Sequence, residues 1–134
     1  RIRQRIAPEQ SLPAGGQGAV GIESRVDDDR VNALLQPLHH VRTAHCVLAE
    51  RAMNGHLQGG CQVPIACYAM LEESAAGEEE LWLRGLVGSP DGARVLRDDI
   101  RGNVTEAEEL GITLANRLLA QGAGEILKAV YGDD

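Results

Sequence analysis

The chain has 134 residues, a length that suits one domain of ordinary size, and 43% of them are apolar, which is enough for a hydrophobic core. The formal net charge of -7 argues against a surface that binds nucleic acid or an anionic membrane. No apolar run approaches the roughly 18 residues that a membrane-spanning helix needs. Three cysteines at irregular spacing do not suggest a disulfide framework and favour a reducing cytoplasm.

The first 37 residues read as short, loosely connected pieces. Residues 1–6 are typical of the last turn of a helix, which Pro8 ends. A Pro- and Gly-rich connection over residues 11–18 leads to an apolar run at residues 19–24, which predicts a buried strand. Because no neighbouring segment offers this strand a partner, its sheet is expected to lie outside the chain. Three aspartates at positions 27–29 predict the start of a helix that reaches Leu35.

A helix and three strands are predicted after residue 37. Apolar residues at spacings of three and four predict a helix that ends near Gly55, with a buried face made of Leu38, Val41, Ala44, Leu48 and Ala52. Residues 65–72, 81–87 and 94–101 have the composition of strands, and the short turns between them predict an antiparallel meander. On the middle strand, alternation separates two sides, with Leu81, Leu83 and Gly85 on one and Trp82, Arg84 and Leu86 on the other.

Helices are predicted after the strands. Thr105 and Glu108 match a capping box that opens a helix, and its buried face is predicted to be Ile112, Ala115, Leu118 and Leu119. Residues 125–131 add a last turn or two. The predicted fold class is therefore α+β, a three-stranded antiparallel sheet covered on one face by helices.

The segment GGCQVPI at residues 59–65 is the most informative stretch of the chain. Gly59 and Gly60 let the backbone turn sharply and let a bulky group come close, and Pro64 prevents a helix from running through. We therefore expect Cys61 to lie on a bent loop with its sulfur exposed. The alternative is that Cys61 is a small buried hydrophobe, as single cysteines often are.

Four segments, in this order along the chain, resemble the porphobilinogen deaminase family, also called hydroxymethylbilane synthase: LPAGGQGAVGIE at residues 12–23, AERAMN at 49–54, GGCQVPI at 59–65 and WLRGLVGSPDG at 82–92. The resemblance covers essentially the whole chain. It implies the C-terminal part of a longer, three-domain enzyme. Residues 1–37 would then be the ends of the second and first α/β domains with the hinge, and residues 38–134 would be the C-terminal cofactor-attachment domain.

The resemblance also implies a function. The enzyme would join four porphobilinogen molecules head to tail, with loss of ammonia, into hydroxymethylbilane in tetrapyrrole (heme) biosynthesis. Cys61 would hold the dipyrromethane cofactor through a thioether bond, and Gln17, Gly18 and Gly60 would bind the cofactor or the substrate pyrroles. The catalytic aspartate and the arginines that bind substrate would come from the N-terminal part of the enzyme, so this chain alone is expected to be inactive. The complete enzyme is expected to be a cytoplasmic monomer that binds neither nucleic acid nor membrane.

Other polar residues are interpreted more plainly. The histidines and cysteines between residues 39 and 67 show no CxxC or HExxH spacing, so no metal site is expected. Cys46 and Cys67 are expected to be packed in the helix and the strand, and Glu50 with Arg51 to form an orienting or solvated pair. Arg25 could contact a substrate carboxylate, but beside three aspartates it is more often part of a surface ion pair. Asp98 and Asp99 are expected to be solvated.

A rival function from another class stays open. The chain could be a stand-alone α+β binding or regulatory module that keeps the fold but attaches nothing. The mass of the intact protein would separate the two interpretations, because only the first requires two pyrrole units on Cys61.

Overall fold

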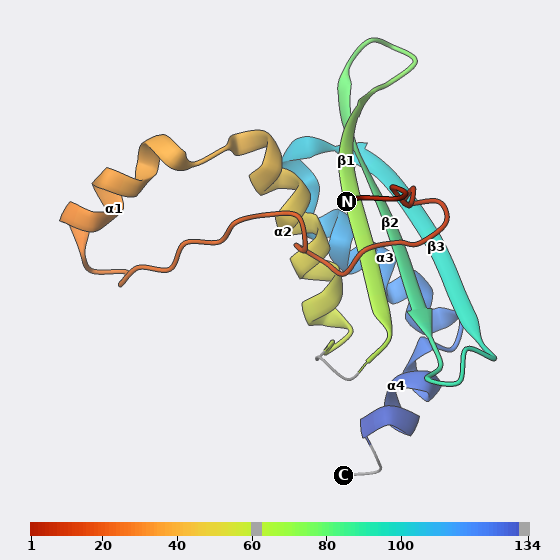
Figure 1. The fold of residues 1–134 in the computed structure, drawn as a ribbon. Helices are drawn as coiled ribbons and strands as arrows, with labels where there is room; N and C mark the ends of the chain where they lie inside the picture. Colours follow the sequence, from red (N-terminus) through yellow and green to blue (C-terminus); the bar gives the residue numbers. More distant parts are fainter. Residues whose placement is uncertain (60–62, 132–134) are drawn as a thin grey trace.

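A computed structural model describes residues 1–59 and 63–131 and is built around one three-stranded sheet (Figure 1). Strands β1 (Ile65–Glu73), β2 (Glu79–Gly88) and β3 (Val95–Asn103) pair antiparallel in the order β1-β2-β3. Gly77 and Gly92 adopt φ values of 79° and 73° in the two tight connections, a conformation that glycine reaches without steric cost. The predicted meander is confirmed, with each strand boundary within two residues of the expected position.

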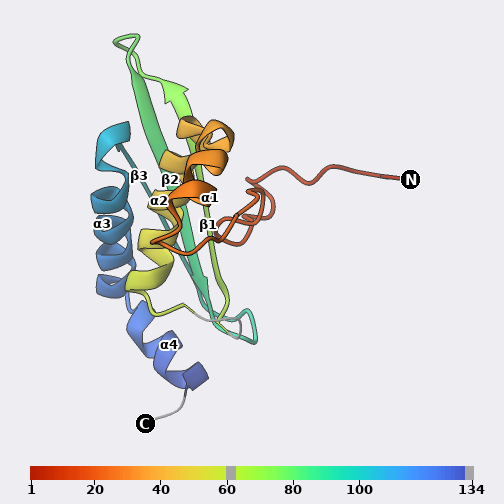
Figure 2. The same ribbon diagram turned by 90° about the vertical axis from the view of Figure 1, so that its left-hand side faces the viewer.

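Helices cover one face of this sheet. Helices α2 (Val41–His56) and α3 (Ala107–Ala120) pack side by side on that face, while the N-terminal segment lies on the opposite side (Figure 2). Helix α4 (Ala123–Tyr131) continues past one end of the sheet. The predicted α+β class is therefore confirmed. Within the described residues, no helix is long and apolar enough to cross a membrane.

The predicted alternation along β2 is also confirmed. Leu81, Leu83 and Val87 face the helices and are fully buried. Gly85 lies on the same side, where a Cβ would come within 2.7 Å of Met53 Cε, so the missing side chain lets α2 pack directly on the strand. The other face of the sheet is more polar.

The predicted buried face of α2 is wrong. Leu38, Val41 and Leu48 are each about half or more exposed, whereas Ala49 and Met53 are fully buried. Ala44 and Ala52 of the predicted face are partly buried. Helix α3 approaches α2 closely at Gly111, where an added Cβ would collide with the backbone of α2.

The N-terminal 28 residues form no regular helix or strand, so the predicted helix end at residues 1–6 is wrong. Residues 19–24 form no strand within this chain, and the expectation that their sheet lies outside it stays a prediction. Val20 is 93% exposed and Ile22 is 55% exposed. A strand requires a hydrogen-bonded neighbour, and the described residues supply none here. Helix α1 (Asp29–Leu35) does form, and the Asp28 carboxylate caps it by accepting a hydrogen bond from Val31 N at 3.0 Å.

Helix α3 does not begin with the predicted capping box. Instead, Asn103 Oδ1 accepts from Thr105 N at 2.9 Å and starts a 3₁₀ turn, Val104–Glu106, that leads into the helix. The buried face is correspondingly rotated from the prediction: Ile112 and Leu119 are only partly buried, and the buried residues are Ala107, Leu110, Gly111, Leu114, Ala115 and Leu118.

Candidate functional site

The helix side of the GGCQVPI segment is fixed to the fold. Helix α2 ends at His56, Leu57 is its C-cap, and Gln58 then takes a positive φ of 54°. Gly59 N donates to Asn54 O at 2.9 Å. Because a side chain at position 59 would collide with the Asn54 carboxamide, glycine allows the chain to leave the helix along this path.

The strand side of the same segment is fixed too. Val63 is 8% exposed, and Pro64 O accepts a hydrogen bond from Gly88 N at 2.9 Å, which ties the start of β1 to the end of β2. Gly60 and Cys61 fall between these two ends and lie outside the described residues. The covalent role of Cys61 and the binding role of Gly60 therefore stay predictions.

Gln17 and Gly18 lie on a turn that runs along the free edge of β1. Pro13 O accepts from Cys67 N at 3.0 Å, so the segment before the turn occupies the edge of the sheet. The turn is closed by two hydrogen bonds between Ala14 and Gln17, one from Gln17 N to Ala14 O and one from Ala14 N to Gln17 Oε1, both at 3.1 Å. The Gln17 carboxamide is therefore held by the backbone of its own turn.

A cavity of about 610 Å³ lies between this turn, α2 and β1, and Gln17, Gly18, Cys46 and Tyr68 are among its lining residues. Among the described residues, neither the Gln17 side-chain N–H groups nor the Gly18 backbone N–H has a hydrogen-bond partner. These groups are suitable donors for a carboxylate.

Glu50 is the buried polar centre of this region. It is 5% exposed, and its two carboxylate oxygens accept from Ala69 N at 2.7 Å and Gly16 N at 2.6 Å. Burial raises the pKa of Glu50, and the two backbone hydrogen bonds oppose that shift. The predicted pair of Glu50 with Arg51 does not form, because Glu50 is buried against these backbone donors whereas Arg51 is exposed.

The two other cysteines differ in burial. Cys67 is fully buried on β1, and its Sγ donates to Glu50 O at 3.6 Å. Burial and, to a smaller degree, the Glu50 carboxylate raise the pKa of Cys67 to about 12. Cys46 is partly buried at the cavity wall, and burial raises its pKa as well. Neither thiol has the exposed, ionised character of a reactive cysteine.

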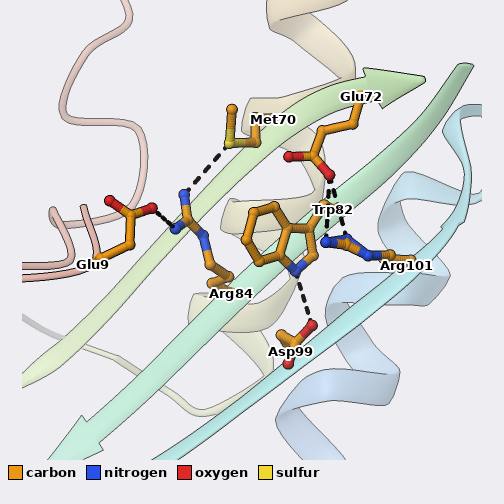
Figure 3. A network of polar contacts seen from close by, with 7 residues as sticks. All are labelled: Glu9, Met70, Glu72, Trp82, Arg84, Asp99 and Arg101. Atoms are coloured by element: carbon orange, nitrogen blue, oxygen red, sulfur yellow. Dashed lines mark hydrogen bonds and ion pairs between the residues drawn. The ribbon is translucent and has the colours of Figure 1, made fainter. Parts of the chain in front are cut away.

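The face of the sheet opposite the helices carries a cluster of arginine and aromatic side chains that was not predicted from the sequence (Figure 3). The Arg84 guanidinium lies 4.3 Å from the Trp82 ring centroid and 5.3 Å from that of Tyr68, and it donates to Glu9 Oε1 at 2.7 Å. Arg101 lies on Trp82 as well, 4.1 Å from its centroid. In the sequence, Arg84 interrupts the apolar stretch from Leu81 to Val87, and this interruption was the available signal for the cluster.

Other acidic groups have structural partners or lie at the surface. Asp99 was expected to be solvated, and it is exposed but accepts from Trp82 Nε1 at 2.8 Å. Arg25 pairs with Asp28 at 3.6 Å on the surface, in agreement with the plainer interpretation. In the described ranges, no group of three or more His, Cys, Asp or Glu side chains is arranged to hold a metal ion.

Comparison with protein-family models matches residues 44–120 to the C-terminal domain of porphobilinogen deaminase. This range is more than half of the chain and runs from the first turns of α2 to the end of α3. The chain belongs to the porphobilinogen deaminase C-terminal domain family. The matched range includes the GGCQVPI segment, whereas Gln17 and Gly18 precede it.

The two predicted parts of the porphobilinogen deaminase site lie at different places along β1. Gly59 is beside Ile65 at the start of the strand, whereas the cavity lined by Gln17 and Gly18 borders residues 68–71. Three to six extended residues, roughly 10 to 20 Å, separate these positions. Gln17 and Gly18 therefore do not lie next to Gly59, the described start of the GGCQVPI segment, although both are joined to the same helix and strand.

Proposed function

We propose that this chain is the cofactor-anchoring part of a hydroxymethylbilane synthase. The complete enzyme would join four porphobilinogen molecules head to tail with loss of ammonia to give hydroxymethylbilane. The observation that carries the proposal is the family match over α2, the sheet and α3, within which the GGCQVPI segment is tied to the fold at both ends.

Of the three cysteines, Cys61 is the one that suits covalent attachment of the cofactor. A covalent anchor needs a thiolate that a bulky pyrrole can reach. Cys67 does not fit, because it is buried against Glu50 with a raised pKa, and Cys46 is partly buried in the middle of a helix. Cys61 follows two glycines in the sequence between α2 and β1, and residues without side chains let a bulky group come close to the backbone.

The dipyrromethane bound to Cys61 would supply the terminal pyrrole on which each new ring is added. This chain's own residues would hold and orient that assembly. Gln17 and Gly18 would donate hydrogen bonds to acetate and propionate carboxylates, which agrees with their unused N–H groups at the cavity. The acid–base group and the arginine clamps would come from the N-terminal part of the enzyme, the partner that this chain requires. The complete enzyme would work as a cytoplasmic monomer.

A turnover assay tests the proposal. We expect the complete enzyme to convert porphobilinogen into hydroxymethylbilane, and the 134-residue chain alone to form no product. In the complete enzyme, Cys61→Ser should abolish turnover, whereas Cys46→Ser and Cys67→Ser should retain it if circular dichroism shows them folded. Product formation by the isolated chain, or by the Cys61→Ser enzyme, would contradict the proposal.

A further inference from the structure

Glu50 is a buried carboxylate without a cationic partner. In the described part of the chain, no Arg, Lys or His lies within ion-pair distance of it. A buried charge that lacks an ion pair must be stabilised by hydrogen-bond donors. Glu50 has two such donors, and both are backbone N–H groups from segments that are far apart in sequence, Gly16 and Ala69.

The two donors show what the carboxylate connects. β1 is an edge strand, so every second N–H along it points away from β2. Of these outward groups, Cys67 N donates to Pro13 O and Ala69 N donates to Glu50 Oε1. The other oxygen of Glu50 takes the Gly16 N–H, so one side chain joins the strand edge to the turn that carries Gln17.

This arrangement requires a carboxylate and not merely a polar side chain of the same shape. Each oxygen accepts from one N–H, so both ends of the group must be acceptors. A glutamine amide offers one acceptor and would place its own N–H₂ against the remaining backbone donor. That donor, either the buried Ala69 N–H or the partly buried Gly16 N–H, would be left without a partner, which costs more than the loss of an exposed hydrogen bond.

Close packing holds the same turn from a second side. A Cβ at Gly15 would lie 2.8 Å from Cys67 Sγ and 3.8 Å from Glu50 O, so the turn sits on the sulfur with no room for a side chain. The Cys67 Sγ in turn donates to Glu50 O. Backbone, sulfur and carboxylate therefore fix residues 13–17 relative to α2 and β1.

We propose that Glu50 is a positioning residue that holds Gln17 and Gly18 at a fixed place relative to α2, the helix that leads into the GGCQVPI segment. Helix α2 continues for one turn from Glu50 to Asn54, whose carbonyl oxygen accepts the Gly59 N–H. One helix thus carries both the support of the Gln17 turn and the support of the predicted cofactor loop. This inference rests on the proposed function only in assigning Gln17 and Gly18 to the pyrrole chain.

Hydrogen exchange on the 134-residue chain tests the bridge without any assay of activity. In Glu50→Gln, the Gly16 and Ala69 amides should exchange on the order of tenfold to a hundredfold faster than in the wild type, the range expected for loss of a charge-assisted hydrogen bond. Glu72→Gln is the matched control, because Glu72 is a carboxylate of the same sheet that pairs with Arg101 at the surface. Unchanged exchange at Gly16 in Glu50→Gln would overturn the bridge.

Steady-state kinetics of the complete enzyme tests the positioning role. If Glu50 places binding groups, Glu50→Gln should raise KM for porphobilinogen on the order of tenfold, with kcat per cofactor-loaded enzyme changed by about twofold at most. A purely structural role would lower the active fraction, and hence apparent kcat, at an unchanged KM. That second pattern would overturn the proposal. A wild-type enzyme without turnover would refute the proposed function instead, and the exchange experiment would still decide on the bridge.

A second variant guards against simple unfolding of Glu50→Gln. Gly15→Ala pushes the turn away from Cys67 Sγ without altering Glu50. It should accelerate exchange at Gly16, and Gly15→Ala combined with Cys67→Ala should restore slow exchange because the clash is relieved. Absence of this rescue would contradict the described placement of the turn and overturn the proposal.

Discussion

Gly111 lies where α3 approaches α2 closely, and Gly111→Ala should destabilise the domain. A Cβ at this position would lie 2.8 Å from Ala52 Cβ and 2.9 Å from Met53 N, and it would collide with Ala49 O. Two of these three atoms belong to the backbone of α2, which cannot move aside as a flexible side chain could. Relief therefore requires the two helices to separate within the core.

The expected magnitude follows from two opposing effects. Replacing a helical glycine by alanine stabilises a helix by about 1 kcal/mol, whereas overpacking a core costs roughly 1–3 kcal/mol and occasionally more. Because backbone atoms set the limit here, we expect the upper end of that cost and a net loss of about 2 kcal/mol in the free energy of unfolding. With a urea m-value of about 2 kcal/mol per M, the unfolding midpoint should fall by about 1 M.

Gly55→Ala is the matched control on the neighbouring helix. Gly55 lies near the end of α2, and an added Cβ there meets no atom within 4 Å. Helix propensity alone should therefore act and raise the free energy of unfolding by about 0.5–1 kcal/mol. Urea unfolding followed by circular dichroism measures both variants. A Gly111→Ala protein as stable as Gly55→Ala would refute the described packing of α2 on α3.

Two further predictions follow from the pKa shifts. Because burial raises the pKa of Cys67 to about 12, its alkylation by iodoacetamide at pH 8 should be on the order of a thousandfold slower than that of a free thiol, and peptide-resolved labelling as fast as that of Cys46 would contradict this. The pKa of Glu9 is lowered, first by a hydrogen bond from its own backbone N–H and then by the Arg84 guanidinium. The contact of Glu9 with the sheet should therefore be fully present above the pKa of Glu9 in the unfolded chain, and it should be lost as the pH falls through the lower pKa of the folded protein. Fluorescence of Trp82, the sole tryptophan of the sequence, should report this acid transition, and a Glu9→Gln protein with the same transition would rule out Glu9 as its cause.

The strands could be predicted because their signals are local. Turn residues at 89–92 and the alternation from Leu81 to Val87 depend only on neighbours in sequence, and both predictions are confirmed. The inward face of α2 could not be predicted in this way. The apolar residues of α2 that are buried, Ala49 and Met53, lie next to Gly111, more than 50 residues away in the sequence. Such a contact between distant segments leaves no signal in the local apolar spacing.

The candidate site was predictable in part. The importance of the Gln17 turn came from a family resemblance, and the structure adds what holds the turn, namely Glu50 and the edge of β1. Sequence alone could not pair Gly16 with Ala69 through one carboxylate, because such a contact depends on the fold. Residues 19–24 have the apolar pattern of a strand, but the described residues offer them no neighbouring strand, and Val20 and Ile22 are exposed.

Locating the cofactor on the chain tests the central claim most directly. The complete enzyme should be digested with a protease, and its cysteine peptides examined by mass spectrometry together with the mass of the intact protein. We predict an added mass of two pyrrole units on the peptide that contains Cys61, with the Cys46 and Cys67 peptides unmodified. An intact protein without the adduct, or an adduct on the Cys46 or Cys67 peptide, would contradict the assignment of this domain as the cofactor anchor through Cys61.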